Sequence, residues 1–73
     1  MTTEIKLLDV VALSGDLPQH NLTRWQVGTV VEVLAPNVFE VEFSDNHGRT
    51  YASLALEANQ LIVLHYEPAG ARP

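Results

Sequence analysis

The segment 38–43 constrains the fold most, because apolar and charged side chains alternate along it without a break. Its sequence is Val-Phe-Glu-Val-Glu-Phe, so in an extended strand Phe39, Val41 and Phe43 share one face while Glu40 and Glu42 share the other. A slip of one residue in the register would bury both glutamates. The alternation therefore predicts a strand with one buried face that fixes the register of a sheet.

Four further segments also have the composition of strands, namely residues 7–13, 27–35, 49–56 and 61–66. The segment 27–35 is almost entirely β-branched and aliphatic, which favours a strand over a helix. Gly28 within it indicates a bulge or a close approach of another backbone. The chain is thus predicted to form five short strands and no helix of useful length.

The connections carry turn residues. Pro36 and Asn37 indicate a tight turn, and residues 44–48 indicate a hairpin loop with Gly48 in a left-handed conformation. Residues 57–60 fit a single helical turn before the last strand. The longer connection 17–26 contains Leu17, Leu22 and Trp25, and we expect it to fold back over one end of the sheet.

A flat sheet of these strands would leave long apolar edges, so the sequence favours an all-β barrel in which the sheet curls and closes. The predicted layout is an N-terminal extension over 1–6, a barrel over 7–66 and a disordered tail over 67–73.

Composition narrows the class of partner and the compartment. The 73 residues include no cysteine, which excludes disulfides and thiolate metal sites. The net charge of -5, with four scattered Lys and Arg, argues against nucleic acid and favours a basic protein as partner. No apolar run is long enough to span a bilayer, and the first residues lack a signal-peptide pattern. A cytoplasmic protein is expected.

Residues 26–33 followed by 39–43 resemble KOW-type and related SH3-like barrels, which implies a small SH3-like fold. The span 7–66 also resembles a bacterial family of about this length whose function is unknown, so it implies no activity. The residues that carry this resemblance are 8–13, 16–18, 27–32, 40–43 and Leu61. A weaker resemblance is to the SH3-like part of the nitrile hydratase β-subunit, through His20, Arg24, Trp25, Gly28 and Val30. The chain departs from these relatives in being acidic and in having Trp25 near a position where many of them have glycine.

Candidate catalytic and metal-binding residues do not converge in the sequence. His20, His47 and His65 lie in three separate segments, without the spacing that places two ligands on one face. Ser14, Ser44 and Ser53 lack an adjacent histidine with an orienting acid. Glu40 and Glu42 share a face but no predicted pocket. We therefore expect no enzyme activity, no metal and no cofactor.

Two interpretations of Trp25 are open. It can be an exposed anchor in a binding surface, where it would join Tyr51 and Tyr66 in a groove for a proline-rich peptide. Alternatively, it plugs the end of the barrel beneath Leu17 and Leu22. The second interpretation is favoured from the sequence, because the loop around Trp25 is too apolar to be freely solvated.

The predicted function is a non-catalytic protein–protein interaction module, acting as an accessory, regulatory or antitoxin-like partner of a more basic protein. The residues expected to bind that partner are Trp25, Leu17, Leu22, Glu32, Glu40 and Glu42. Two alternatives stand beside it. One is a self-assembling structural homo-oligomer, for example a homodimer formed by pairing of exposed strand edges. The other is KOW-like binding of RNA or a ribonucleoprotein.

Overall fold

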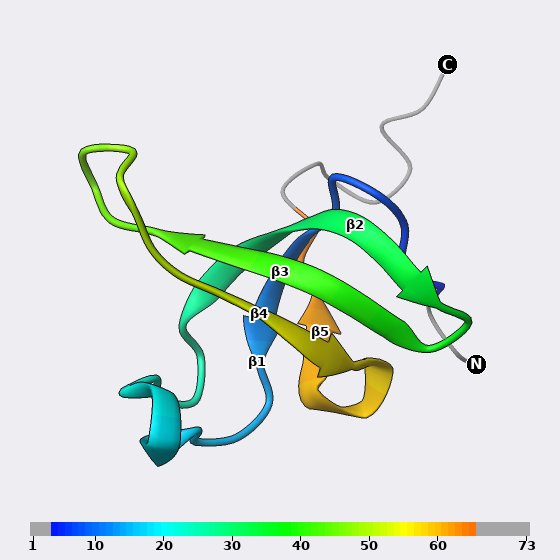
Figure 1. Cartoon of the computed structure of the whole chain (residues 1–73), viewed down its shortest axis with the longest axis horizontal. Helices are drawn as coiled ribbons and strands as arrows, with labels where there is room; N and C mark the ends of the chain where they lie inside the picture. The colour runs from blue at the N-terminus through cyan, green and yellow to red at the C-terminus, as the bar shows by residue number, and fades with distance from the viewer. Residues whose placement is uncertain (1–3, 66–73) are drawn as a thin grey trace.

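The computed structural model describes residues 4–65, which form one antiparallel sheet (Figure 1). Its strands are β1 (Val10–Leu13), β2 (Val27–Ala35), β3 (Val38–Ser44), β4 (Thr50–Glu57) and β5 (Leu61–Val63). Two 3-10 helices, η1 (Pro18–His20) and η2 (Ala58–Gln60), interrupt the connections. The all-β prediction is confirmed. No helix of the described residues is long and apolar enough to cross a membrane.

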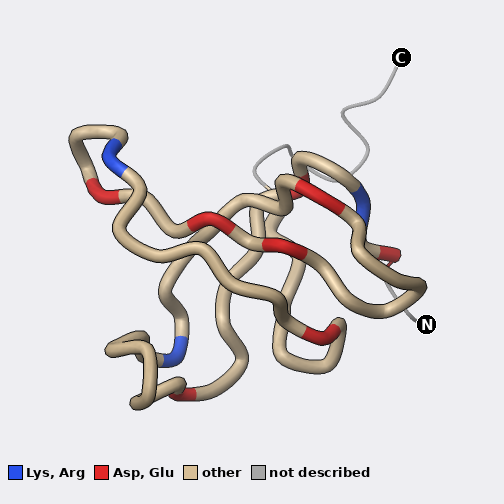
Figure 2. The backbone as a smooth tube through the Cα atoms, viewed as in Figure 1, with Lys and Arg blue, Asp and Glu red and all other residues tan. Residues whose placement is uncertain are grey.

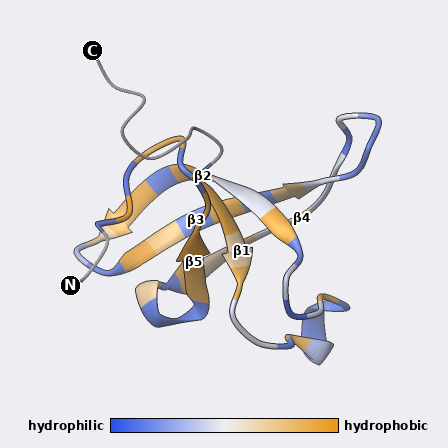
Figure 3. Ribbon diagram, turned by 180° about the vertical axis from the view of Figure 1, so that it is seen from behind, coloured by the Kyte–Doolittle hydropathy of each residue, from blue (hydrophilic) through white to orange (hydrophobic). Residues whose placement is uncertain are grey.

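The strand order in the sheet is β4-β3-β2-β1-β5. The long strands β2 and β3 curve, so that β1 and β5 lie behind them in Figure 1 and in front of them in the reverse view of Figure 3. Within residues 4–65, β4 and β5 are the two edges and do not pair with each other. The sheet therefore curls as predicted, but closure into a barrel is not confirmed.

The core lies on the inner face of this curled sheet. β3 shows the predicted alternation, with Phe39, Val41 and Phe43 buried beneath it. The register continues this face into β4, where Phe39 pairs with Leu56 and Val41 with Leu54. The buried cluster also includes Val11, Leu13, Leu22, Val30 and Leu61. Burial of these side chains is the main source of stability in a chain without disulfides.

Gly28 explains how closely β2 approaches β3. A Cβ atom at this position would lie 2.7 Å from Val41 Cγ1 and 2.8 Å from the backbone oxygen of Glu42. The predicted close approach is therefore confirmed. The register shifts of β2 lie further along the strand, between Val30 and Glu32 and between Val33 and Ala35.

The turns are close to prediction, whereas the first and last strands are shorter than predicted. Gly48 has a φ of 79°, in the left-handed region expected of it. β1 begins at Val10 rather than Leu7, because a turn with a positive φ at Leu8 precedes it. β5 ends at Val63. The predicted tail and Tyr66 lie outside the described residues.

Candidate partner-binding site

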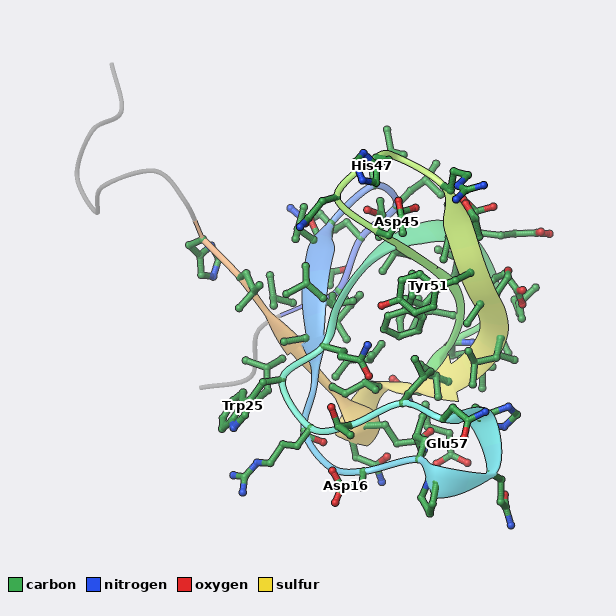
Figure 4. All side chains as sticks on the ribbon, turned by 90° about the vertical axis from the view of Figure 1, so that its left-hand side faces the viewer. Asp16, Trp25, Asp45, His47, Tyr51 and Glu57 are labelled. Atoms are coloured by element: carbon green, nitrogen blue, oxygen red, sulfur yellow. The ribbon has the colours of Figure 1, made fainter. Side chains whose placement is uncertain are left out.

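Trp25 is exposed at the surface, so the expectation that it plugs one end of a barrel is wrong. The side chain of Trp25 is 58% exposed, whereas Leu22 of the same connection is 1% exposed and belongs to the core cluster. Leu17 and Leu22 exchange two backbone hydrogen bonds of 2.8 and 3.1 Å, which close the loop over Leu22. Figure 4 shows Trp25 outside the sheet, on the side of β5.

A tight turn holds Trp25 in this place. The amide of Gln26 donates to the carbonyl of Thr23 at 3.1 Å, and Trp25 is the third residue of that turn with a φ of 77°. Trp25 then donates to the carbonyl of Leu13, while Leu13 donates to the carbonyl of Gln26, each at 2.9 Å. Trp25 and Gln26 on one strand thus lie opposite the single residue Leu13 on the other, which is a β-bulge. This is the bulge whose first residue is usually a glycine in the left-handed region.

The same arrangement occurs at the other end of the β1–β2 pair, with Leu8 in the place of Trp25. Asp9 donates to the carbonyl of Lys6 at 3.1 Å, and Leu8 has a φ of 72°. Leu8 donates to the carbonyl of Val30 at 2.7 Å, and Val30 donates to that of Asp9 at 2.9 Å. Leu8 is 70% exposed. The chain therefore contains an internal control for Trp25.

Side-chain acceptors complete both turns in the same way. The amide of Thr23 donates to Gln26 Oε1 at 2.6 Å, and the amide of Lys6 donates to Asp9 Oδ2 at 2.8 Å. In each turn the fourth residue therefore caps the first. These bonds fix the backbone of the turn without any contribution from the side chain at its third position.

Exposed apolar side chains also flank β1 on its outer face. Ala12 pairs with Val27 on one side and with Ile62 on the other, so these three residues share a face. Val27 and Ile62 are exposed there. Figure 3 colours both β1 and β5 as hydrophobic along their length. We call Trp25, Val27 and Ile62 the Trp25 surface.

Arg24 restrains the exposed indole. Its guanidinium carbon lies 4.5 Å from the centroid of the Trp25 ring, within the range of a cation–π interaction. Its backbone amide donates to Asp16 Oδ1 at 2.8 Å. An anchor that is already ordered loses less conformational entropy when a partner binds.

An acidic face lies further along the same outer surface of the curled sheet, on β2, β3 and β4. Glu32 pairs directly with Glu40, and Glu42 pairs with Thr29, on the outer face of β2 and β3. Glu57 shares this face through its pairing with Val38. We call Glu32, Glu40, Glu42 and Glu57 the acidic face (Figure 2). The three strands that carry it contain no Lys or Arg.

The predicted partner-binding residues therefore do not form one site. Glu32, Glu40 and Glu42 come together as expected, and Trp25 is exposed. Figure 4 nevertheless places Trp25 on the β5 side of the curled sheet and β4 on the other side. Leu22 is buried in the core and is not available to a partner.

Residues 7–63 match the family model described as Domain of unknown function (DUF4926). This match covers more than half of the chain. The chain belongs to the DUF4926 family. Neither the curated proteins nor the solved structures yielded a match. The family match confirms the resemblance to a family of unknown function. The resemblances to KOW-type barrels and to the nitrile hydratase β-subunit gain no support from these three comparisons.

The DUF4926 region contains the whole sheet, Trp25 and the acidic face. Sequence reasoning missed Glu57 and the Leu8 turn. Glu57 could have been found by counting along residues 49–57, because it follows Ser53 and Ala55 on alternate positions. The Leu8 turn gives no such signal, since leucine is not a turn residue.

The candidate catalytic residues of this DUF4926 domain lie apart. His20, His47 and His65 are exposed, and residues 4–65 contain no group of three or more metal-ligating side chains. The hydroxyl of Ser14 donates to the carbonyl of Asn59 at 3.2 Å, and that of Ser53 donates to Glu40 Oε2 at 2.7 Å. The expectations of no catalysis and no cofactor stay predictions.

Proposed function

We propose that this DUF4926 domain is a non-catalytic protein-binding module that anchors a more basic protein through Trp25. The observation that carries the proposal is the exposed indole at a left-handed backbone position. Such a conformation costs a bulky residue about 1–2 kcal/mol, whereas glycine adopts it freely. Since the side chain gains no burial in the core, folding gives no reason for tryptophan at this position.

The surroundings of Trp25 suit a protein interface. Tryptophan is enriched among the residues that dominate binding energy. Val27 and Ile62 add exposed apolar side chains on the outer face of the neighbouring strands, and Arg24 supplies a polar group against the indole. Interfaces commonly have this apolar centre with a polar margin.

The charge of the domain favours a basic partner. The net charge is -5, and the acidic face concentrates four carboxylates without a cation on the same strands. Such a face attracts positively charged proteins over a distance and raises their association rate. It lies on β2, β3 and β4, toward the β4 edge, whereas Trp25 lies on the β5 side, so it steers the partner while Trp25 supplies the anchor.

The experiment compares the tagged full chain with its Trp25→Gly and Leu8→Gly variants in quantitative capture from native lysate. Both substitutions remove a large side chain from equivalent left-handed positions, so both variants keep the fold. We expect a basic protein that the wild type and Leu8→Gly recover equally and that Trp25→Gly loses. Equal recovery by Trp25→Gly, or recovery of no specific protein by the wild type, contradicts the proposal.

A further inference from the structure

β4 is an edge strand of the sheet that residues 4–65 form. It pairs with β3 alone, and the backbone groups of residues 51–56 form no hydrogen bond with any other described part of the chain. It is eight residues long, whereas β5 at the other edge has three residues. Figure 1 shows no strand beyond it.

This edge lacks the features that usually prevent pairing with another chain. Proteins protect edges with proline, with lysine or with very short strands. β4 has the sequence Thr-Tyr-Ala-Ser-Leu-Ala-Leu-Glu, so it contains no proline and no basic residue, and its single charge is Glu57 at the end. An extended segment can therefore form main-chain hydrogen bonds along it.

We propose that the free edge of β4 binds an extended segment of a basic protein as a sixth strand of the sheet. The inference rests on the proposed function in one respect, that the partner is a basic protein. It adds the site, the conformation and the sequence pattern of the segment that binds.

The outer face indicates why that segment is basic. Ser53 and Ala55 point outward from β4, as Glu57 does at its end, and they pair with Glu42 and Glu40 of β3. An added strand would lie about 4.8 Å beyond β4 and about 10 Å from β3. Because Ser53 and Ala55 are small, lysine or arginine side chains on the added strand can extend over them to the two carboxylates.

The inner face indicates what alternates with the basic residues. Ala52 and Leu54 point inward and are partly buried against the core. Apolar side chains on the inward positions of the added strand would cover them further. The segment is therefore expected to alternate basic and apolar residues, as in other cases of strand addition where alternate side chains give specificity.

A second copy of this chain is a poorer occupant of the same edge. Pairing of two β4 strands would bring two acidic faces together on one side of the extended sheet, with a charge of -5 on each chain. Like charges on neighbouring strands are destabilising. Charge complementarity thus selects a basic segment over self-association.

The test uses a synthetic peptide of alternating lysine and valine, eight residues long like β4. It is titrated into the ¹⁵N-labelled full chain while amide shifts and hydrogen exchange are followed by NMR. We expect shifts and slowed exchange centred on residues 51–56, with affinity falling as salt rises from about 0.05 M to about 0.5 M. A glutamate–valine peptide should not bind, and N-methylation of alternate residues of the lysine peptide should abolish binding.

Two variants locate the site. The double substitution Ser53→Lys with Ala55→Lys places like charges beside the added strand and should weaken binding by at least about tenfold. The matched control, Gln19→Lys with Asn46→Lys, makes the same change in net charge at exposed positions outside the sheet and should bind more tightly than that double variant. The NMR spectrum of each variant reports its fold, and the N-methylated peptide decides the matter if the first variant does not fold.

Several results would overturn the inference. These are shifts confined to the Trp25 surface, equal binding of the N-methylated peptide, or a concentration-dependent dimer in light scattering that protects residues 51–56 without peptide. Failure here is distinguishable from failure of the proposed function, because capture lost in Trp25→Gly depends on a residue on the β5 side, at the other end of the strand order from the β4 edge.

Discussion

The backbone amide of Trp25 donates a 2.9 Å hydrogen bond to the carbonyl of Leu13, a residue with no exposed surface. The return bond from Leu13 to Gln26 has the same length. The turn that carries the indole is therefore attached directly to a core strand. Its exposure is a fixed property of the fold, and the identity of the side chain at position 25 can be changed without altering the bonds that hold the turn.

The first prediction is that Trp25→Gly does not destabilise the domain. Relief of the left-handed strain, about 1–2 kcal/mol, is partly offset by the greater entropy of glycine in the unfolded chain, about 0.4–1 kcal/mol. Urea denaturation should show a free energy of unfolding that is unchanged or higher by up to about 1 kcal/mol. A clear loss of stability would mean that the indole packs against the fold.

Gly28 gives the second prediction. Gly28→Ala would place a methyl group 2.7 Å from Val41 Cγ1 and 2.8 Å from the backbone oxygen of Glu42. Because that oxygen belongs to the ladder and cannot move freely, we expect a loss of about 2–3 kcal/mol in urea denaturation. Gly15→Ala is the matched control, since a Cβ there meets nothing within 4 Å. Equal stability of the two variants would contradict the close approach of β2 and β3.

The third prediction concerns the pair formed by Glu32 and Glu40. Like charges directly opposite each other on neighbouring strands repel. Glu32→Gln should therefore raise the free energy of unfolding by a few tenths of a kcal/mol at low salt, and the gain should shrink at about 1 M salt because of screening. Thermal denaturation at the two salt concentrations measures it. A gain that does not depend on salt would point to a cause other than charge.

Leu22 gives the fourth prediction. It belongs to a connection rather than to a strand, yet it is 1% exposed and forms part of the core cluster. Leu22→Ala should cost about 2–5 kcal/mol, as for a leucine in a strand. Leu8→Ala, at a 70% exposed position, should change stability by less than about 0.5 kcal/mol. Similar losses in both variants would show that the loop does not close over the core.

The local pattern predicted much of the fold. Residues 27–35 form the expected strand, the alternation of 38–43 sets the buried face, and Gly48 adopts the expected positive φ. These features depend on neighbouring residues, so a single sequence contains the signal. The clustering of Glu32 with Glu40 also followed from the expected hairpin.

The position of Trp25 could not be predicted in the same way. Turns are recognised from glycine, asparagine and proline, and here a tryptophan and a leucine adopt the left-handed conformation. Hydrogen bonds to Leu13 and Val30, which are distant in sequence, stabilise these turns. The apolar character of the loop suggested burial, but Leu22 alone fills the core position, and Trp25 remains outside.

The most direct test of the account is the affinity of the captured partner for the wild type and for Trp25→Gly, measured by calorimetry beside the stability of both proteins. We predict binding that is weaker by about thirtyfold or more in Trp25→Gly, with no loss of folding stability. Leu8→Gly should bind like the wild type. Equal affinity of Trp25→Gly and the wild type would contradict the claim that Trp25 anchors a partner.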